Sequence, residues 1–194
     1  MDTRAALLAA AAQEFARLGL KGARIREIVA RSGVNERMIY HHFGSKEGLY
    51  QAVFKHEAAG VKEVWREALE QAAGMEPYDG VRHVYRTYFD MMHARPLLLA
   101  LVTQEAVGGW GARPQMSDDA VPEELRALYD QGVAEGIFSA DLDLDVVYVT
   151  AVSALVSVPG MAGHFPDLIA RRGMAALRDQ VVALLMDGMT GERK

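Results

Sequence analysis

Two adjacent histidines, His41 and His42, are the residues of this sequence that first suggest a chemical role. They lie in the stretch GVNERMIYHHFGSK, residues 33–46, together with a glutamate, an arginine, a tyrosine and a lysine. Imidazole is a common metal ligand and general base, and the same set of side chains also suits contacts to nucleic-acid phosphates. Two metal ligands on one helix normally stand four residues apart and need a third ligand, whereas neighbouring helical residues point about 100° apart. The spacing therefore argues against a shared metal ion, and we predict none here.

Three short helices are predicted to position this stretch. Apolar residues recur at spacings of three and four through residues 3–18, 24–31 and 35–42, and either Asp2 or Thr3 is placed to cap the first helix. A turn containing Gly33 separates the second helix from the third, which is the arrangement of a helix-turn-helix. The apolar inner face of these two helices comprises Ile25, Ile28, Val29, Val34, Ile39 and Phe43. The outward positions of the third helix then carry donors and acceptors that suit a DNA major groove.

The charge distribution restricts any polyanion contact to the N-terminal part of the chain. The formal net charge of the whole chain is −5. Residues 1–55 hold nine Arg and Lys against five Asp and Glu, a balance of +4, so the remainder carries −9. A basic head on an acidic body indicates that only the head meets a nucleic acid.

The composition excludes several other classes of protein. Apolar residues make up 51% and charged residues 24%, which is typical of a globular chain. The absence of cysteine excludes disulfides, thiolate nucleophiles and cysteine-based zinc sites. The longest apolar run, residues 146–158, is interrupted by Tyr, Thr and Ser, so no membrane span is predicted, and the N-terminus does not resemble a secretory signal. We therefore expect a cytoplasmic protein.

The rest of the chain is also predicted to be helical. Proline, glycine and acidic first-turn residues mark the helix ends, and no segment alternates like a strand. Six further helices are expected at about 45–73, 77–94, 96–107, 122–136, 143–158 and 166–186. The predicted fold is therefore all-α with about nine helices, divided into a DNA-binding domain at residues 1–55 and a second domain at residues 56–194.

The first 55 residues resemble the DNA-binding domain of the tetracycline-repressor (TetR) family. The resemblance is carried by twelve residues at the spacing of the family pattern: Phe15, Gly19, Ile28, Gly33, Val34, Tyr40, His42, Phe43, Ser45, Lys46, Glu47 and Leu49. It implies an all-helical dimeric transcription regulator, usually a repressor, that a small molecule bound in the C-terminal domain releases from a palindromic operator. An activator, or an effector-independent DNA-binding protein of the same fold, remains the alternative.

Matching this family residue by residue assigns roles within the head. Tyr40, His42 and Lys46 take phosphate-contacting positions, and the start of the third helix takes the variable base-reading positions. A threonine pair usually opens the second helix in the family; here Ala23 and Arg24 replace it, so the cap is lost while the guanidinium keeps a phosphate contact within reach. Glu36 either accepts from a cytosine amino group or pairs with Arg37, and His41 is either a contact or a rim residue. The predicted DNA-binding residues are Arg24, Arg26, Asn35, Glu36, Arg37, Tyr40, His41, His42 and Lys46.

The second domain is expected to hold an effector pocket. Methionine and aromatic residues at helical spacing form either a plain core or the wall of a cavity, with a histidine or glutamate as its polar group. Trp110, in a glycine-rich loop, either gates such a pocket or packs. The predicted pocket residues are Phe89, Met92, His93, Leu101, Glu105, Trp110, Val149, Val152, Ser153 and Val156.

The last two predicted helices, at 143–158 and 166–186, carry apolar residues on more than one face. A helix that is apolar on two faces needs two partners, and a second copy of the chain supplies the second. In the TetR family these helices form a four-helix dimer bundle, so a homodimer on double-stranded DNA is expected. Paired catalytic carboxylates, a Ser/His/Asp set and metal-ligand helices are lacking in the sequence, so we predict neither an enzyme nor a cofactor.

Overall fold

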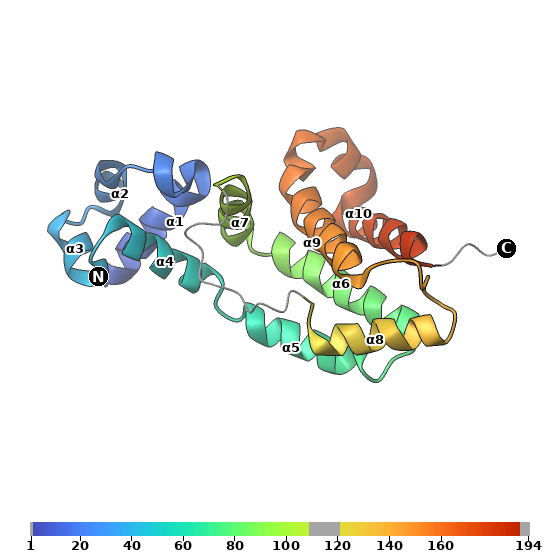
Figure 1. Cartoon of the computed structure of the whole chain (residues 1–194). Helices are drawn as coiled ribbons and strands as arrows, with labels where there is room; N and C mark the ends of the chain where they lie inside the picture. The colour runs from blue at the N-terminus through green and yellow to red at the C-terminus, as the bar shows by residue number, and fades with distance from the viewer. Residues whose placement is uncertain (1, 109–120, 191–194) are drawn as a thin grey trace. The chain divides into compact units, whose positions relative to one another are not determined.

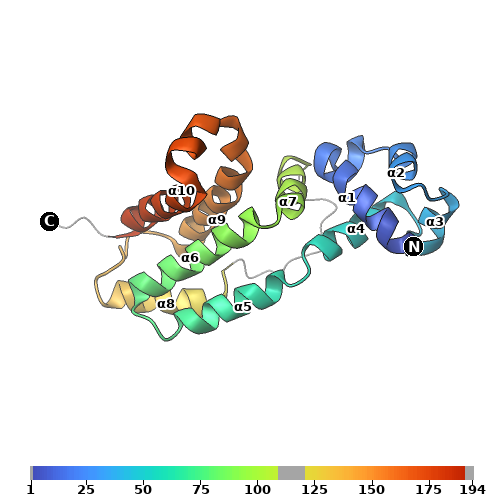
Figure 2. The same ribbon diagram turned by 180° about the vertical axis from the view of Figure 1, so that it is seen from behind.

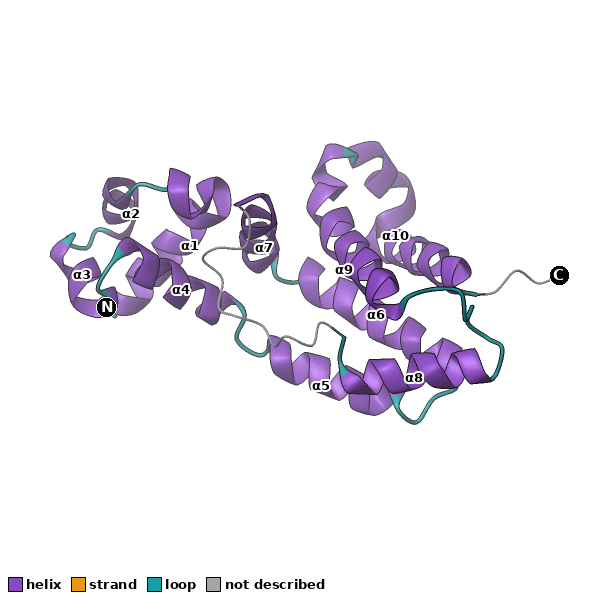
Figure 3. Ribbon diagram, viewed as in Figure 1, coloured by secondary structure: helices purple, strands orange, loops and turns teal. Residues whose placement is uncertain are grey.

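A computed structural model of the chain describes residues 2–108 and 121–190, which form helices joined by loops and turns (Figures 1 and 3). Within them no strand is present, and a single antiparallel β-bridge pairs Phe138 with Thr190. The predicted all-α class is confirmed. The helices are α1 (Thr3–Gly22), α2 (Ile25–Ser32), α3 (Arg37–Phe43), α4 (Lys46–Glu57), α5 (Val61–Ala72), α6 (Pro77–His93), α7 (Pro96–Gly108), α8 (Glu123–Ala134), α9 (Leu144–Met161), the 3-10 helix η1 (Ala162–His164) and α10 (Pro166–Met189).

Side-chain caps fix the starts of α1 and α4. The Asp2 carboxylate accepts from the amides of Arg4 and Ala5, at 2.9 and 3.3 Å, and thereby caps α1. The Ser45 hydroxyl accepts from the amide of Gly48 at 3.0 Å at the start of α4. Because the first-turn amides have no partner inside their own helix, these oxygens set where each helix begins.

One predicted helix is in fact two. The segment at 45–73 was expected to be continuous, but α4 ends at Glu57 and α5 begins at Val61. Gly60 between them has a φ of 78°, in the left-handed region that glycine adopts without a steric penalty. The helical pattern of apolar residues continues across this glycine, which is why the sequence alone did not indicate the break.

Two helices near the C-terminus also differ from expectation. α9 does not stop at Pro159 but continues to Met161, with that proline buried inside the helix. α10 contains Gly173 in a non-helical conformation, with φ 76° and ψ 159°, so two helical segments meet there at a kink.

The chain forms two compact units. The head unit comprises Met1–Ala59 and Arg95–Gln115, and the body unit comprises Gly60–Ala94 and Met116–Lys194. α7, which is distant in sequence, belongs to the head unit together with the N-terminal helices, and the predicted domain division at residue 55 stays a prediction. In the head unit α1 packs against α2, α4 and α7.

The body unit is built around α6. This helix lies between the α5/α8 pair and the α9/α10 pair, as two opposite views show (Figures 1 and 2). Its buried residues include Val84, Tyr85 and Phe89, which share a core with side chains of α8, α9 and α10. In the described part of the chain one helical stretch, Leu144–His164, is long and apolar enough to cross a membrane by length and composition. Ala151 and Leu155 of that stretch are buried in this core.

Candidate nucleic-acid interface

The turn between α2 and α3 sets the direction of α3. Gly33 has a φ of 67°, and its amide donates to the Val29 carbonyl at 3.0 Å, which ends α2. Asn35 follows, and its side-chain oxygen accepts from the amide of Arg37 at 2.9 Å. The predicted capping role of Asn35 is confirmed, although α3 begins two residues later than expected.

Burial of one face fixes which side chains α3 presents. Ile28 and Ile39 are fully buried beside Phe15 in the core of the head unit. α3 is short, and the burial of Ile39 on one face leaves most of its other side chains facing solvent. The exposed residues are Asn35, Glu36, Arg37, Tyr40, His41 and His42. The structure therefore brings six of the nine predicted DNA-binding residues onto one exposed segment.

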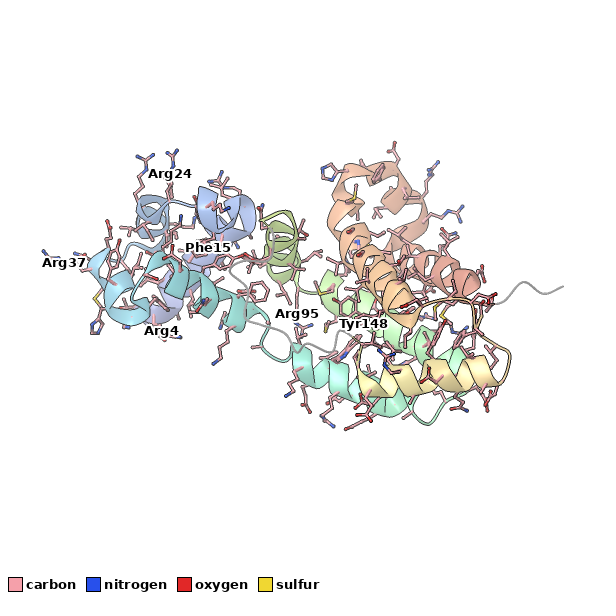
Figure 4. All side chains as sticks on the ribbon, viewed as in Figure 1. Arg4, Phe15, Arg24, Arg37, Arg95 and Tyr148 are labelled. Carbon is pink, nitrogen blue, oxygen red and sulfur yellow. The ribbon has the colours of Figure 1, made fainter. Side chains whose placement is uncertain are left out.

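The arginines of α2 differ from each other in their partners. Arg24 precedes α2, and among the described residues no side chain caps this helix, as the missing threonine pair predicts. Its side chain extends away from the helices, as does that of Arg37 (Figure 4). The Arg26 guanidinium is instead 3.0 Å from Glu27, so part of its charge is compensated. In the described part of the chain no ion pair joins Glu36 to Arg37, which leaves both side chains available to a ligand.

Lys46 is held at the junction of α3 and α4. It is the first residue of α4, where the partial positive charge of the helix end favours an anion. Close packing fixes this junction, because a Cβ at Gly48 would lie 2.0 Å from the Phe43 carbonyl oxygen. The Lys46 side chain therefore starts beside the N-terminal amides of α4.

The rings of His41 and His42 lie beside each other on α3. Their ring centroids are 5.0 Å apart, with planes inclined at 67°. Within residues 2–108 and 121–190, no group of three or more His, Asp or Glu side chains is placed to hold a metal ion. His42 also contacts the ring of Phe43, at 6.0 Å between centroids.

A buried hydrogen bond ties the head helices to α7. Tyr50 and Glu105 are both buried, and the Tyr50 hydroxyl donates to the Glu105 carboxylate at 2.7 Å. Burial raises the pKa of Tyr50, and the bond to Glu105 raises it further. Leu101, one turn earlier on α7, is fully buried in the same core. Leu101 and Glu105 are among the predicted pocket residues, and both are buried on α7 in the head unit.

The other predicted effector residues are dispersed. Phe89 and Met92 are buried in the body unit, whereas His93 is exposed. Val149 is 60% exposed, and the neighbouring exposed Ser153 donates its hydroxyl proton to the Val149 carbonyl at 2.7 Å. Val152 and Val156 are half-buried, and Trp110 lies outside the described residues. The described residues of this set lie in both units, and the pocket stays a prediction.

An exposed polar α3, held after a glycine turn on a three-helix core, defines a helix-turn-helix DNA-binding protein. Residues 7–53 match the family model described as "Bacterial regulatory proteins, tetR family". Residues 77–183 match the model described as "Tetracyclin repressor-like, C-terminal domain". The chain therefore belongs to the TetR family of transcriptional regulators, and it is a regulator and not an enzyme.

Curated relatives and solved structures agree with this assignment. The chain is 30% identical over 156 residues to the HTH-type transcriptional repressor NicS of Pseudomonas putida, covering 78% of this chain and 73% of NicS. It is 27% identical over 153 residues to the repressor KstR2 of Mycobacterium tuberculosis, covering 75% and 74% of the two chains. The solved structure of KstR2, described as a ketosteroid transcriptional regulator, matches with a TM-score of 0.68 at 21% identity, over 97% of this chain and 95% of that one. A gamma-butyrolactone receptor structure matches with a TM-score of 0.63 at 23% identity, over 96% and 98%.

Replacing Tyr50 by Phe is expected to destabilise the head unit. The change removes a donor from a buried carboxylate, which costs about 1–3 kcal/mol of unfolding free energy. The effect also depends on pH. The pKa of Tyr50 is raised in the folded state, so its contribution is complete below about pH 10 and is lost as the unfolded chain releases the proton above it. Chemical denaturation between pH 8 and 11 should therefore give a shallower alkaline loss for Tyr50→Phe than for the wild type.

The matched control is Tyr40→Phe, because Tyr40 is 51% exposed. Its stability should equal that of the wild type at every pH. Equal stability of Tyr50→Phe and Tyr40→Phe would contradict the structural role of the Tyr50–Glu105 bond.

Proposed function

We propose that this protein is a homodimeric cytoplasmic repressor that binds a palindromic operator and leaves it when a small-molecule effector binds. The observation that supports this proposal is the set of exposed polar residues in segment 35–42, which is held on a buried core. Beside them, Arg24 and Arg37 have no carboxylate partner among the described residues. The relatives NicS and KstR2 are both named repressors, which supports the sign of regulation. An activator of the same fold would bind the same DNA, and transcription assays with purified protein separate the two.

Arg37 is proposed to read a base. It is the first residue of α3, it is exposed, and no carboxylate in the described residues pairs with it. The planar guanidinium donates two parallel hydrogen bonds to the O6 and N7 atoms of guanine, which is the commonest specific contact to DNA. Asn35 and Glu36 precede Arg37 in the chain, and their side chains are also exposed.

Substituting Arg37 by Ala is expected to relax sequence preference at one base pair of each half-site. Loss of a bidentate guanine contact costs about 1–3 kcal/mol of discrimination, or roughly 5- to 150-fold. Selection of binding sites from a randomised duplex library measures this directly. Arg37→Lys is the control, because it keeps the charge but not the planar fork, and should retain non-specific affinity while losing the preference. An unchanged selected sequence for both variants would remove Arg37 from the reading set.

Lys46 is proposed to clamp a phosphate together with the N-terminus of α4. Lys46→Ala should weaken binding to all duplexes alike, because a phosphate contact carries no sequence information. Each lost contact should reduce the slope of log K against log salt by about 0.9. Fluorescence anisotropy across a salt series gives this slope.

Lys55→Ala is the matched control, since Lys55 is exposed on the last turn of the same helix, about 13 Å along its axis from Lys46. This control should keep the wild-type slope. If the Lys46 variant does so as well, Lys46 makes no phosphate contact.

The proposed dimer uses the apolar outer face of α9 and α10. Val146 and Val149 of α9 are 62% and 60% exposed, and Leu184 of α10 is 73% exposed. A groove of about 280 Å³ lies between the start of α9 and the end of α10, lined by Val146, Val147, Leu184 and Leu185 among others. Exposed aliphatic side chains clustered on two adjacent helices favour burial against a second copy of the same helices. Such a two-fold dimer would present two α3 helices to one face of the DNA.

Leu184→Glu is expected to give a folded monomer. A charge in the centre of an apolar interface loses its hydration without gaining a partner, so association weakens. Analytical ultracentrifugation measures the oligomeric state, and operator affinity should fall in parallel. Met75→Glu is the control, because it also places a charge on an exposed apolar position, but on a residue outside α9 and α10. A Leu184→Glu protein that sediments as a dimer would contradict this interface.

The proposed effector acts by shifting a population of conformations. Only two residues, Ala94 and Arg95, separate the end of α6 in the body unit from the start of α7 in the head unit. A ligand that moves α6 therefore has a short covalent route to the α7 helix, which the Tyr50–Glu105 bond fastens to α4. If the protein exchanges between a conformation that binds the operator and one that does not, the effector changes operator affinity by binding one of them more tightly.

A further inference from the structure

We propose that Arg4, in the first turn of α1, is an additional DNA-backbone contact that the ring of Phe43 holds in position. This inference rests on the proposed binding of α3 to DNA and extends its contact surface onto α1. Arg4 is not among the DNA-binding residues predicted from the sequence, because the family resemblance implies phosphate contacts only near α2, α3 and α4.

The guanidinium of Arg4 contacts the side chain of Phe43, which is the last residue of α3. Its Cζ atom is 5.4 Å from the centroid of the Phe43 ring, within the range of a cation–π interaction. That ring in turn contacts the ring of His42, at 6.0 Å. Arg4 and His42 thus both contact one aromatic ring, three residues before Lys46 in the chain.

The pattern of ion pairs in the head sets Arg4 apart. Residues 2–55 contain six arginines, and three of them, Arg17, Arg26 and Arg31, lie within 4 Å of a glutamate oxygen, at 3.0, 3.0 and 3.9 Å. In the described residues the other three have no carboxylate partner, and they are Arg4, Arg24 and Arg37. All three are exposed. Two of them are already predicted DNA contacts, and Arg4 shares both of their properties.

A cation–π contact leaves the N–H donors of a guanidinium free to bind an anion. The Arg4 Cζ atom lies over the Phe43 ring at 5.4 Å, and a guanidinium carries five N–H donors in its own plane. A hydrogen-bonded carboxylate would occupy those same donors. The ring also restricts the rotamers of a long side chain before DNA arrives, which lowers the entropic cost of binding. Phe43 is therefore a positioning residue, and Arg4 is the residue that touches phosphate.

The test measures binding of the full-length protein to a fluorescein-labelled random-sequence 30-base-pair duplex over a range of KCl concentrations. Arg4→Ala should weaken binding by about 5- to 20-fold at 0.1 M salt and reduce the salt slope by about 0.9 for each protomer that contacts the duplex. Because Arg4 is exposed, the melting temperature of the Arg4→Ala protein should stay within about 2 °C of that of the wild type. Arg4→Lys should keep the slope but lose part of the affinity, since an ammonium stacks less well than a guanidinium.

A double-mutant cycle tests the role of Phe43. Phe43→Leu should weaken binding when Arg4 is present and change it by less than 2-fold in the Arg4→Ala background. Equal effects in both backgrounds would overturn the positioning role of Phe43. A wild-type slope for Arg4→Ala together with a lowered melting temperature would overturn the proposal and make Arg4 a structural contact between α1 and α3.

Two reference proteins separate this inference from the proposed function. Lys55→Ala should bind the duplex like the wild type, and Lys46→Ala should weaken binding. If the wild type does not bind duplex DNA, the proposed function itself fails. If the wild type binds and Lys46→Ala weakens binding while Arg4→Ala does not, only the assignment of Arg4 fails.

Discussion

The buried ring of Tyr50 is the contact on which the head of this protein depends. Its edge meets the ring of Phe15 on α1, at 4.9 Å and 87°, and its hydroxyl donates to Glu105 on α7. One side chain of α4 thereby joins three helices that lie far apart in the sequence. An aromatic pair of this geometry adds to the free energy of burial, and the hydrogen bond gives the buried carboxylate a donor. The position of α3 follows, because α3 is held on α1 and α4 by Ile39 and Phe43.

Much of the head could be predicted because its signals are local. A glycine with positive φ, an asparagine that accepts from the first turn and a serine cap act over two or three residues, so they are visible in the sequence. The exposed face of α3 then follows from the helical period once Ile39 is assigned to the core. The approximate bounds of α6, α8 and α9 follow from proline and acidic residues for the same reason.

What could not be predicted depends on contacts across long sequence distances. Gly60 interrupts a helical pattern that is continuous in its apolar residues, so only the backbone conformation reveals the break between α4 and α5. Glu105 was expected in a pocket of the second domain, yet its partner Tyr50 is 55 residues away in the head. Arg4 was absent from the predicted contacts because its partner ring lies 39 residues further along the chain. In each case the sequence shows the residue type, but it does not show which distant residue packs against it.

The chain passes between the two units three times, after residues 59, 94 and 115. The head is therefore not a module that ends where the N-terminal family match ends, at residue 53. Genetic exchange of the first 59 residues alone would separate Tyr50 from Glu105 and leave the α1 surface without Leu101. Recombination that creates a regulator with a new operator should therefore succeed only when the α7 segment of the incoming head comes with it or already matches. The shared core therefore couples the stability of the DNA-recognition helices to that of α7, although the two segments are distant in the sequence.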